Sequence, residues 1–334
     1  MKRTALAALV LLAAVSCRRE AVPFQTVSLV ATIEPDAEAT KAAVSASAYE
    51  WTSPSAEHPI EADIWFSTTE HTFPGNGTNT PGSDVIEVHK TITYNSNSYT
   101  FPDISETETL MSYPSTAKLY CIGFSPRGKW SWNTTSGKAE SVAGLVDGST
   151  DILYAPEISG TGTAKMTTQT FKHALTWIKV RVRAFTTDAS ATWGKLQKIE
   201  IETNDKATYD VKSNSMVFSQ SESAPVKITA YEDSTGEDIP STSKQVGSVF
   251  VAPVYGTSEE SPASLKFKVT TEEWADGKEV TVNLIDENGN YGIGNTAGKL
   301  YVVTLSFKSL NIIEASATLT PWEDEAYTLI GTEQ

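Results

Sequence analysis

Residues 178–184, IKVRVRA, decide the fold class because aliphatic and charged side chains alternate strictly along them. This period of two places successive side chains on opposite faces, which is typical of a half-buried antiparallel β-strand. Apolar residues recur at every second position elsewhere in the chain. The segments that share this alternation are VSLVATI (27–33), LKFKV (265–269), EVTVNL (279–284), YVVTLSF (301–307) and IEASATL (313–319).

The segments between these strands are rich in turn-forming residues, and helical spacing is nearly absent. FPGNGTNTPGSD (73–84) and GTGTAK (160–165) combine Gly with Pro, Asn, Ser and Thr. The chain has 334 residues, 40% of them hydrophobic, which is enough for about two domains of ~150 residues each. We therefore predict an all-β protein of two packed β-sandwiches, with a boundary between residues 187 and 188, in FTTDASATWGK (185–195).

The first residues have the pattern of an export signal. Lys2 and Arg3 precede an apolar run, residues 5–15, and small residues then lead to Cys17. The run is too short to span a bilayer as a helix. Its ending resembles a bacterial lipobox, in which the cysteine is lipidated and becomes the first mature residue. We predict that residues 1–16 are a lipoprotein signal peptide and that Cys17 is a membrane anchor; an ordinary signal peptide containing a cysteine is the alternative.

The charge and the second cysteine restrict the partners and the redox chemistry. The net charge of −15 at pH 7 does not suit a phosphate backbone, so we expect no nucleic acid partner. Cys121 lies in AKLYCIGF (117–124), where it shares an alternating face with Leu119. With Cys17 lipidated it has no partner for an internal disulfide. A buried Cys packs as a small hydrophobe, and we expect this one in the core.

The sequence lacks motifs for catalysis or metal binding. Its four histidines show no HExxH or HxH spacing, and neither a GxSxG elbow nor a P-loop is present. We expect no enzyme activity, no cofactor and no metal site. Trp130 and Trp132 lie close together in GKWSWN (128–133), and exposed aromatics can stack on sugar rings. They are candidate glycan contacts, although packing in a core or on a sheet face is the commoner role.

The order of several motifs is more informative than any one of them. From the lipobox onward the chain resembles, in content and order, the fimbrillin family of surface lipoproteins from Bacteroidetes, which comprises pilin subunits and their accessory proteins. The aromatic-Lys-His-Ala-Leu strand and the terminal Gly…Tyr…Thr-Pro-Trp unit are the more specific parts. The motifs are YPSTAKLYCIGFSPRG (113–128), DILYAPE (151–157), FKHALTWIKVRV (171–182), VFVAPV (249–254) and GKLYVVTLSFKSLNIIEASATLTPW (298–322).

This resemblance implies both a fold and an assembly mechanism. The fold would be two tandem transthyretin-like β-sandwich domains, residues 17–187 and 188–334. A lipidated precursor would reach the outer membrane and the cell surface, where a trypsin-like protease would cut after a basic residue. The cut would remove the first strand, and a strand of another pilus subunit would fill the resulting groove by β-strand addition. The partners implied are other pilus subunits, the outer membrane through Cys17, and a host surface protein or glycan.

Particular residues match these roles. The removable strand would be residues 24–34, and the processing site would be Lys41, where stalk pilins often have Arg. The short tail, residues 323–334, could pair with a neighbouring subunit or close its own domain. The side chains proposed to enter the groove or to be donated are Val27, Leu29, Ala31 and Ile33 in the first strand, and Tyr327, Leu329 and Ile330 in the tail.

Two other interpretations remain open from the sequence. The first and last strands could complete their own sandwiches with no exchange. The protein could instead be a surface glycan-binding lipoprotein of a polysaccharide uptake system, which would need exposed aromatics such as Trp130, Trp132 or Trp193. Within the pilus interpretation, stalk, tip and anchor subunits all fit.

Overall fold

The computed structural model describes residues 28–33, 60–73, 85–92, 98–100, 113, 117–133, 138–141, 146–285, 294–309 and 312–320. Several residues singled out from the sequence lie outside these ranges, namely Cys17, Val27, Lys41, Tyr327, Leu329 and Ile330.

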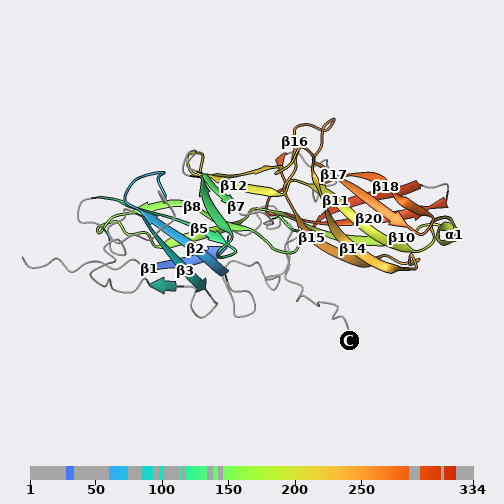
Figure 1. The fold of residues 1–334 in the computed structure, drawn as a ribbon, viewed down its shortest axis with the longest axis horizontal. Helices are drawn as coiled ribbons and strands as arrows, with labels where there is room; N and C mark the ends of the chain where they lie inside the picture. The colour runs from blue at the N-terminus through green and yellow to red at the C-terminus, as the bar shows by residue number, and fades with distance from the viewer. Residues whose placement is uncertain are drawn as a thin grey trace, which may run out of the picture.

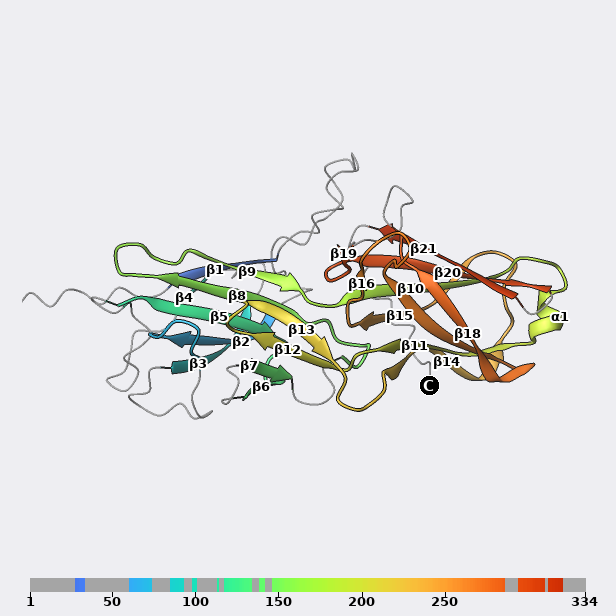
Figure 2. The same ribbon diagram turned by 90° about the horizontal axis from the view of Figure 1, so that it is seen from above.

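The described chain is almost entirely β-structure, which confirms the all-β prediction. Its one described helix, α1 (Ala189–Trp193), is a single short turn, and none of the described helical structure is long and apolar enough to cross a membrane. The strands gather in two groups along the long axis of the molecule (Figures 1 and 2). Most neighbouring strands are antiparallel; β1 with β9 and β10 with β20 are parallel.

The first group combines a seven-stranded and a four-stranded sheet. The order in the larger sheet is β3 (Val85–Ile92), β2 (Ile60–Ser67), β5 (Leu119–Ser125), β8 (Leu153–Gly160), β9 (Thr168–His173), β1 (Ser28–Ile33) and β4 (Ser98–Thr100). The order in the smaller sheet is β13 (Ser215–Ser219), β12 (Lys206–Asp210), β7 (Lys138–Ser141) and β6 (Trp130–Asn133).

Aromatic side chains hold these two sheets face to face. Phe124 of β5 packs against Tyr209 of β12 and Trp130 of β6, with ring centroids 5.0 and 4.8 Å apart. Trp65 of β2 meets Trp132 of β6 edge to face at 5.7 Å. Edge-to-face and tilted contacts at these distances are the favoured arrangements of aromatic pairs. These contacts bury one face of β2 and β5, and β5 is buried at every position.

The second group contains two four-stranded sheets and a small ribbon. The first sheet has the order β15 (Lys244–Val251), β10 (Thr176–Ala184), β20 (Leu300–Lys308) and β21 (Ile312–Thr320). The second has the order β14 (Val226–Glu237), β11 (Leu196–Thr203), β17 (Ser264–Thr271) and β18 (Trp274–Asn283), and β16 (Tyr255–Gly256) pairs with β19 (Gly294–Asn295).

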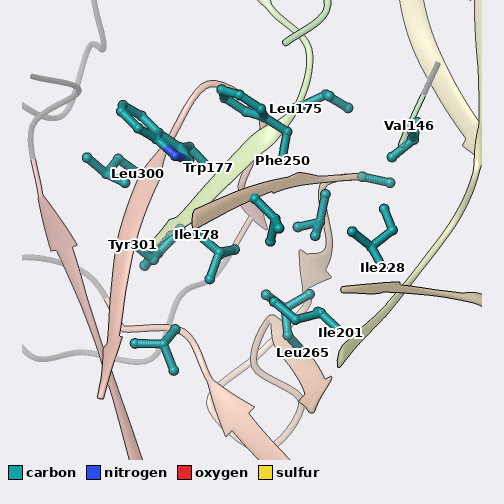
Figure 3. Packing of buried hydrophobic residues seen from close by; sticks show 14 of the residues in the cluster. Val146, Leu175, Trp177, Ile178, Ile201, Ile228, Phe250, Leu265, Leu300 and Tyr301 are labelled. Atoms are coloured by element: carbon teal, nitrogen blue, oxygen red, sulfur yellow. The ribbon is translucent and has the colours of Figure 1, made fainter. Parts of the chain in front are cut away.

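A core of aliphatic and aromatic side chains fills the space within the second group. Ile178 and Tyr301, from β10 and β20, lie toward Ile201 and Leu265 of the opposite sheet (Figure 3). All four are at most 2% exposed. Trp193 of α1 closes this core, with its ring 5.4 Å from that of Phe307 and its Nε1 donating to the Lys308 carbonyl at 2.7 Å.

Three strand pairs cross the expected boundary at residues 187/188. β10 precedes it but pairs with β15 and β20, which follow it. β12 follows it but pairs with β7, which precedes it. A single cut there therefore does not separate the sheets. Alternation identifies a strand and its buried face, whereas the choice of partner depends on contacts far apart in the sequence.

The strand that decided the fold class differs from its prediction in one respect. β10 is a central strand that runs antiparallel to β15 but parallel to β20. The alternation predicts antiparallel neighbours on both sides. Ile178, Val180 and Val182 on its aliphatic face are fully buried, as expected, and Ala184 at its end is partly buried. Lys179, on the other face, is only 7% exposed and places its Nζ 4.7 Å from the centroid of the Trp177 ring. A cation over an indole face is stabilised by the negative potential of the ring, which explains a charge so far from solvent.

Candidate functional site

Strand β1 occupies an internal slot of the seven-stranded sheet. It runs parallel to β9, with Ala31 opposite Gln169 and Ile33 opposite Phe171. On its other side it runs antiparallel to β4, with Leu29 opposite Tyr99. The strand predicted to be removable is therefore present. Its residues 28–30 pair with β4 and its residues 30–33 pair with β9, so Val30 has a partner on both sides. We call the position of β1 between β9 and β4 the β1 slot.

The residues of β9 that face the slot alternate between buried and accessible. Gln169 and Phe171 are fully buried, whereas Thr168 is exposed and Thr170 is half-buried. Laterally paired residues of a sheet share a face. By register, Ala31 and Ile33 therefore belong to the face of β1 that continues the buried face of β9. This is the alternate set that the sequence singled out in β1.

The buried face of β9 covers the single cysteine of the sheet interior. Gln169 Nε2 donates to Cys121 Sγ at 3.2 Å, and neither side chain is exposed to solvent. Burial raises the pKa of the Cys121 thiol, because the thiolate would lose its hydration there. Cys121 is therefore an inert core residue in the intact fold, as predicted, and it lies directly beneath β9.

Tyr113 and Met166 are buried near Cys121 and Gln169, at the start of β9. The Tyr113 hydroxyl accepts a hydrogen bond from the Met166 N–H at 2.8 Å, and both residues are at most 5% exposed. Burial raises the pKa of Tyr113, although the hydrogen bond with the backbone of Met166 acts in the opposite direction. The segment leading into β9 is thus fixed to the sheet interior by one aromatic side chain.

Without β1, β9 would have few residues paired in register with another strand. In register, β9 pairs with β8 only at Leu153 with His173 and at Tyr154 with Lys172. The remaining residues of β9, Thr168 to Phe171, pair in register with β1. Each backbone hydrogen bond contributes about 0.5–1.5 kcal/mol net. Withdrawal of β1 would therefore leave Thr168 to Phe171 of β9 without a paired strand.

A close contact between Gly123 and Phe171 sets the fit of β9 on β5. A Cβ at Gly123 would lie 3.0 Å from Phe171 Cζ and 3.3 Å from its Cε1. Such separations are tighter than ordinary van der Waals contact, so the ring rests against a backbone that has no side chain. A residue with a side chain at position 123 would push β9 away from β5.

We expect Gly123→Val to lower the free energy of unfolding by about 1–3 kcal/mol, the usual cost of overpacking a core. The cost should fall when Phe171→Leu removes the ring atoms that approach Gly123, as chemical denaturation of both single variants and the double variant would measure. An equal cost of Gly123→Val in both backgrounds would contradict the contact. Ala275→Val, which adds atoms at an exposed position of β18, is the matched control and should change stability by less than about 0.5 kcal/mol.

The two tryptophans considered as glycan contacts pack inside the first group of strands. Trp130 is 8% exposed and rests on Phe124. Trp132 is partly buried, stacked on Phe73 at 6.0 Å and edge-on to Trp65. Trp193 is fully buried. These indoles therefore do not form an exposed stacking platform, and they pack in the interior, which is the commoner role of such residues.

Comparison with known protein families agrees with the motif order. The model of the family described as fimbrillin-like matches residues 64–322, well over half of the chain. The chain belongs to the fimbrillin-like family. This match confirms the resemblance inferred from the motifs, and it covers all of β5, β8, β9 and β10. No curated protein matches this fimbrillin-like chain.

Solved structures similar to this fimbrillin-like protein cover nearly all of its length. A proposed cell adhesion protein from Bacteroides ovatus is 12% identical, covers 90% of this chain and 98% of its own, and superimposes with a TM-score of 0.52. A proposed cell adhesion protein from Bacteroides uniformis is 16% identical over 89% and 98% of the two chains, with a TM-score of 0.47. A fimbrial protein from Bacteroides vulgatus is 12% identical over 88% and 99%, with a TM-score of 0.35. At 12% identity, the similarity to the Bacteroides ovatus protein is a similarity of fold.

Proposed function

We propose that this protein is a non-enzymatic subunit or accessory adhesin of a bacterial pilus that assembles by strand exchange at the β1 slot. Membership of the fimbrillin-like family supports the pilus role. The observation that carries the mechanism is that β1 is internal to a sheet and yet is the first described strand of the chain. One cut between β1 and β2 separates it from every other described strand.

The connection from β1 to β2 contains a suitable place for that cut. β1 ends at Ile33 and β2 begins at Ile60, and Lys41 is the only Lys or Arg between them. A trypsin-like protease requires a basic side chain before the bond that it cleaves, so Lys41 is the processing site in this proposal. Cleavage would leave β9 and β4 with unpaired edges, which is the template that β-strand addition uses.

The incoming strand would come from a neighbouring subunit. We propose that its alternate side chains take the places of Ala31 and Ile33 beside the buried face of β9, and that Leu29 and Val27 continue this set. The tail is the candidate donor, with Tyr327, Leu329 and Ile330 on one alternating set. The proposal includes two tandem transthyretin-like sandwiches, with export as a lipoprotein held at the outer membrane by Cys17. A host surface protein or glycan would be the further partner of an adhesive subunit.

Peptide binding to the emptied slot tests this mechanism. A protease recognition sequence in place of residues 36–41 allows β1 to be cut from the folded protein and removed. A synthetic peptide of residues 24–34 should then bind the cut protein and not the intact protein, because the slot is filled in the latter. Fluorescence anisotropy of the labelled peptide measures its binding to the cut protein and to the intact protein.

The two faces of β1 provide matched peptides. Asn at positions 31 and 33 places polar groups opposite buried Gln169 and Phe171, and Asn at position 29 continues the same alternating set. This peptide should bind at least about tenfold more weakly, since burying an unpaired amide costs ~1–3 kcal/mol. Asn at positions 28, 30 and 32 lies beside exposed Thr168 and half-buried Thr170 and should bind nearly as the parent does. Equal binding of the two peptides, or binding to intact protein, would reject the slot as the site of exchange.

A further inference from the structure

We propose that Glu70, His71 and Glu157 form a binding site for a divalent transition cation of the Zn²⁺ class. One ligand atom from each residue, a carboxylate oxygen or an imidazole nitrogen, lies within 4.8 Å of the other two. Glu70 and His71 lie in the turn after β2, and Glu157 lies in β8. The site is separate from the β1 slot, and the inference does not depend on strand exchange.

The closest pair already has the spacing of two ligands on one ion. His71 Nδ1 lies 3.3 Å from Glu157 Oε1. Zinc bonds of ~2.0–2.2 Å to nitrogen and oxygen, set at a tetrahedral angle, place neighbouring ligand atoms about 3.3–3.5 Å apart. An ion can therefore bind both atoms with little rearrangement, and the exposed Glu70 side chain can turn to provide the third bond.

The backbone holds both of these ligands in place. The Glu157 N–H donates to Asn214 Oδ1 at 2.7 Å and to the Tyr209 hydroxyl at 3.2 Å, and these two side chains are hydrogen-bonded to each other. The His71 N–H donates to Glu157 Oε2 at 3.1 Å. Thr72 closes the turn through its N–H to the Thr69 carbonyl. Ligands on fixed backbone lose little freedom when an ion binds.

The electrostatics of Glu157 favour a cation at this position. Its side chain is only 7% exposed. Two carboxylates that lie close together with one imidazole retain an excess of negative charge. A divalent cation would offset both the lost hydration and the mutual repulsion.

The donor set selects the class of cation. Ca²⁺ prefers six to eight oxygen ligands, and Mg²⁺ prefers an octahedral set of oxygens. A site with one imidazole and two carboxylates suits zinc and its neighbours, with water in the remaining position. Such an ion would tie the turn after β2 to β8, next to the β12–β13 hairpin that provides Tyr209 and Asn214.

Calorimetric titration of the folded mature chain with ZnCl₂ near pH 7.5 tests the proposal. We expect one Zn²⁺ per chain, a rise in Tm on binding, and no displacement by a large excess of Ca²⁺. His71→Ala and Glu70→Gln should each weaken Zn²⁺ binding about tenfold or more. Glu70 and His71 are both exposed, so these variants should keep their fold in the absence of metal. Glu259→Gln, at an exposed acid elsewhere, is the matched control and should bind as the parent does.

A spectroscopic readout distinguishes this site from binding by other surface groups. Co²⁺ in place of Zn²⁺ should give visible ligand-field absorption of a four- or five-coordinate site, and His71→Ala should remove or shift it. Binding that keeps its stoichiometry and affinity in His71→Ala would show that His71 is not a ligand and overturn the proposal. The absence of Zn²⁺ binding by the parent protein would overturn it as well.

Discussion

Replacing Lys41 with alanine should abolish assembly of this protein into SDS-resistant multimers on the cells that express it. Lys41 is the only Lys or Arg between the end of β1 and the start of β2, so the variant has no bond there that a trypsin-like protease can cleave. With β1 still covalently attached, the slot refills from its own chain, because an attached strand acts at a far higher effective concentration than one from another subunit. Denaturing gels of unheated surface extracts measure the outcome.

Lys41→Arg is the matched variant for this experiment. It keeps the positive charge that the protease requires and should restore the full ladder. Surface exposure of both variants should equal that of the parent, as whole-cell antibody binding would report, because neither changes the export signal. If Lys41→Ala gave SDS-resistant multimers in the same amount as the parent, assembly would not depend on this cut.

The second large effect concerns the chemical reactivity of Cys121. In a Cys17→Ser variant it is the only thiol, and in the intact fold it should react with a thiol reagent at a rate limited by unfolding, because it is fully buried beneath Gln169. Removing β1 eliminates the strand that pairs with Thr168 to Phe171 of β9. At about 0.5–1.5 kcal/mol for each hydrogen bond, the loss amounts to ~3 kcal/mol and should raise the reaction rate about a hundredfold.

The peptide of residues 24–34 provides the control for this effect. Added to the cut protein, it should return Cys121 to the slow rate, and the peptide with Asn at positions 29, 31 and 33 should not. The circular dichroism of the cut protein should remain that of a β-protein, since β2, β5 and β8 keep their own partners. A Cys121 rate that is unchanged by the cut would mean that β1 does not protect the surface beneath β9.

Local alternation was sufficient to predict six strands of the fold, which are β1, β10, β17, β18, β20 and β21. The segment 27–33 appears as β1 (Ser28–Ile33), and 301–307 and 313–319 appear as β20 (Leu300–Lys308) and β21 (Ile312–Thr320). Each has apolar residues at every second position, and this period is a property of the strand itself. The same reasoning placed Cys121 in the core, where it is fully buried.

The arrangement of strands could not be predicted in this way. Nothing in the segments 176–184 and 300–308 states that they lie side by side and parallel, or that β12 pairs with β7 from the other side of the expected boundary. These pairings depend on the sum of many distant contacts. Gln169 and Phe171 were likewise not selected, although the alternation of TQTFKH (168–173) was a weak signal for them.

The candidate cation site shows the same limit. Glu70 and His71 are adjacent, but Glu157 is 86 residues from His71, and the expected absence of a metal site rested on spacings within short motifs. Local motifs detect ligands that one element supplies, whereas this cluster is formed by a turn and a strand that only the folded sheet brings together.

The most direct test of strand exchange is the N-terminus of the protein in its assembled form. Shearing native cells releases surface material, and mass spectrometry of the high-molecular-weight fraction determines where the chain begins. Strand exchange at the β1 slot predicts a chain that starts at Ala42 within an SDS-resistant ladder. An intact chain that starts at lipidated Cys17, monomeric and absent from any fibre, would contradict it.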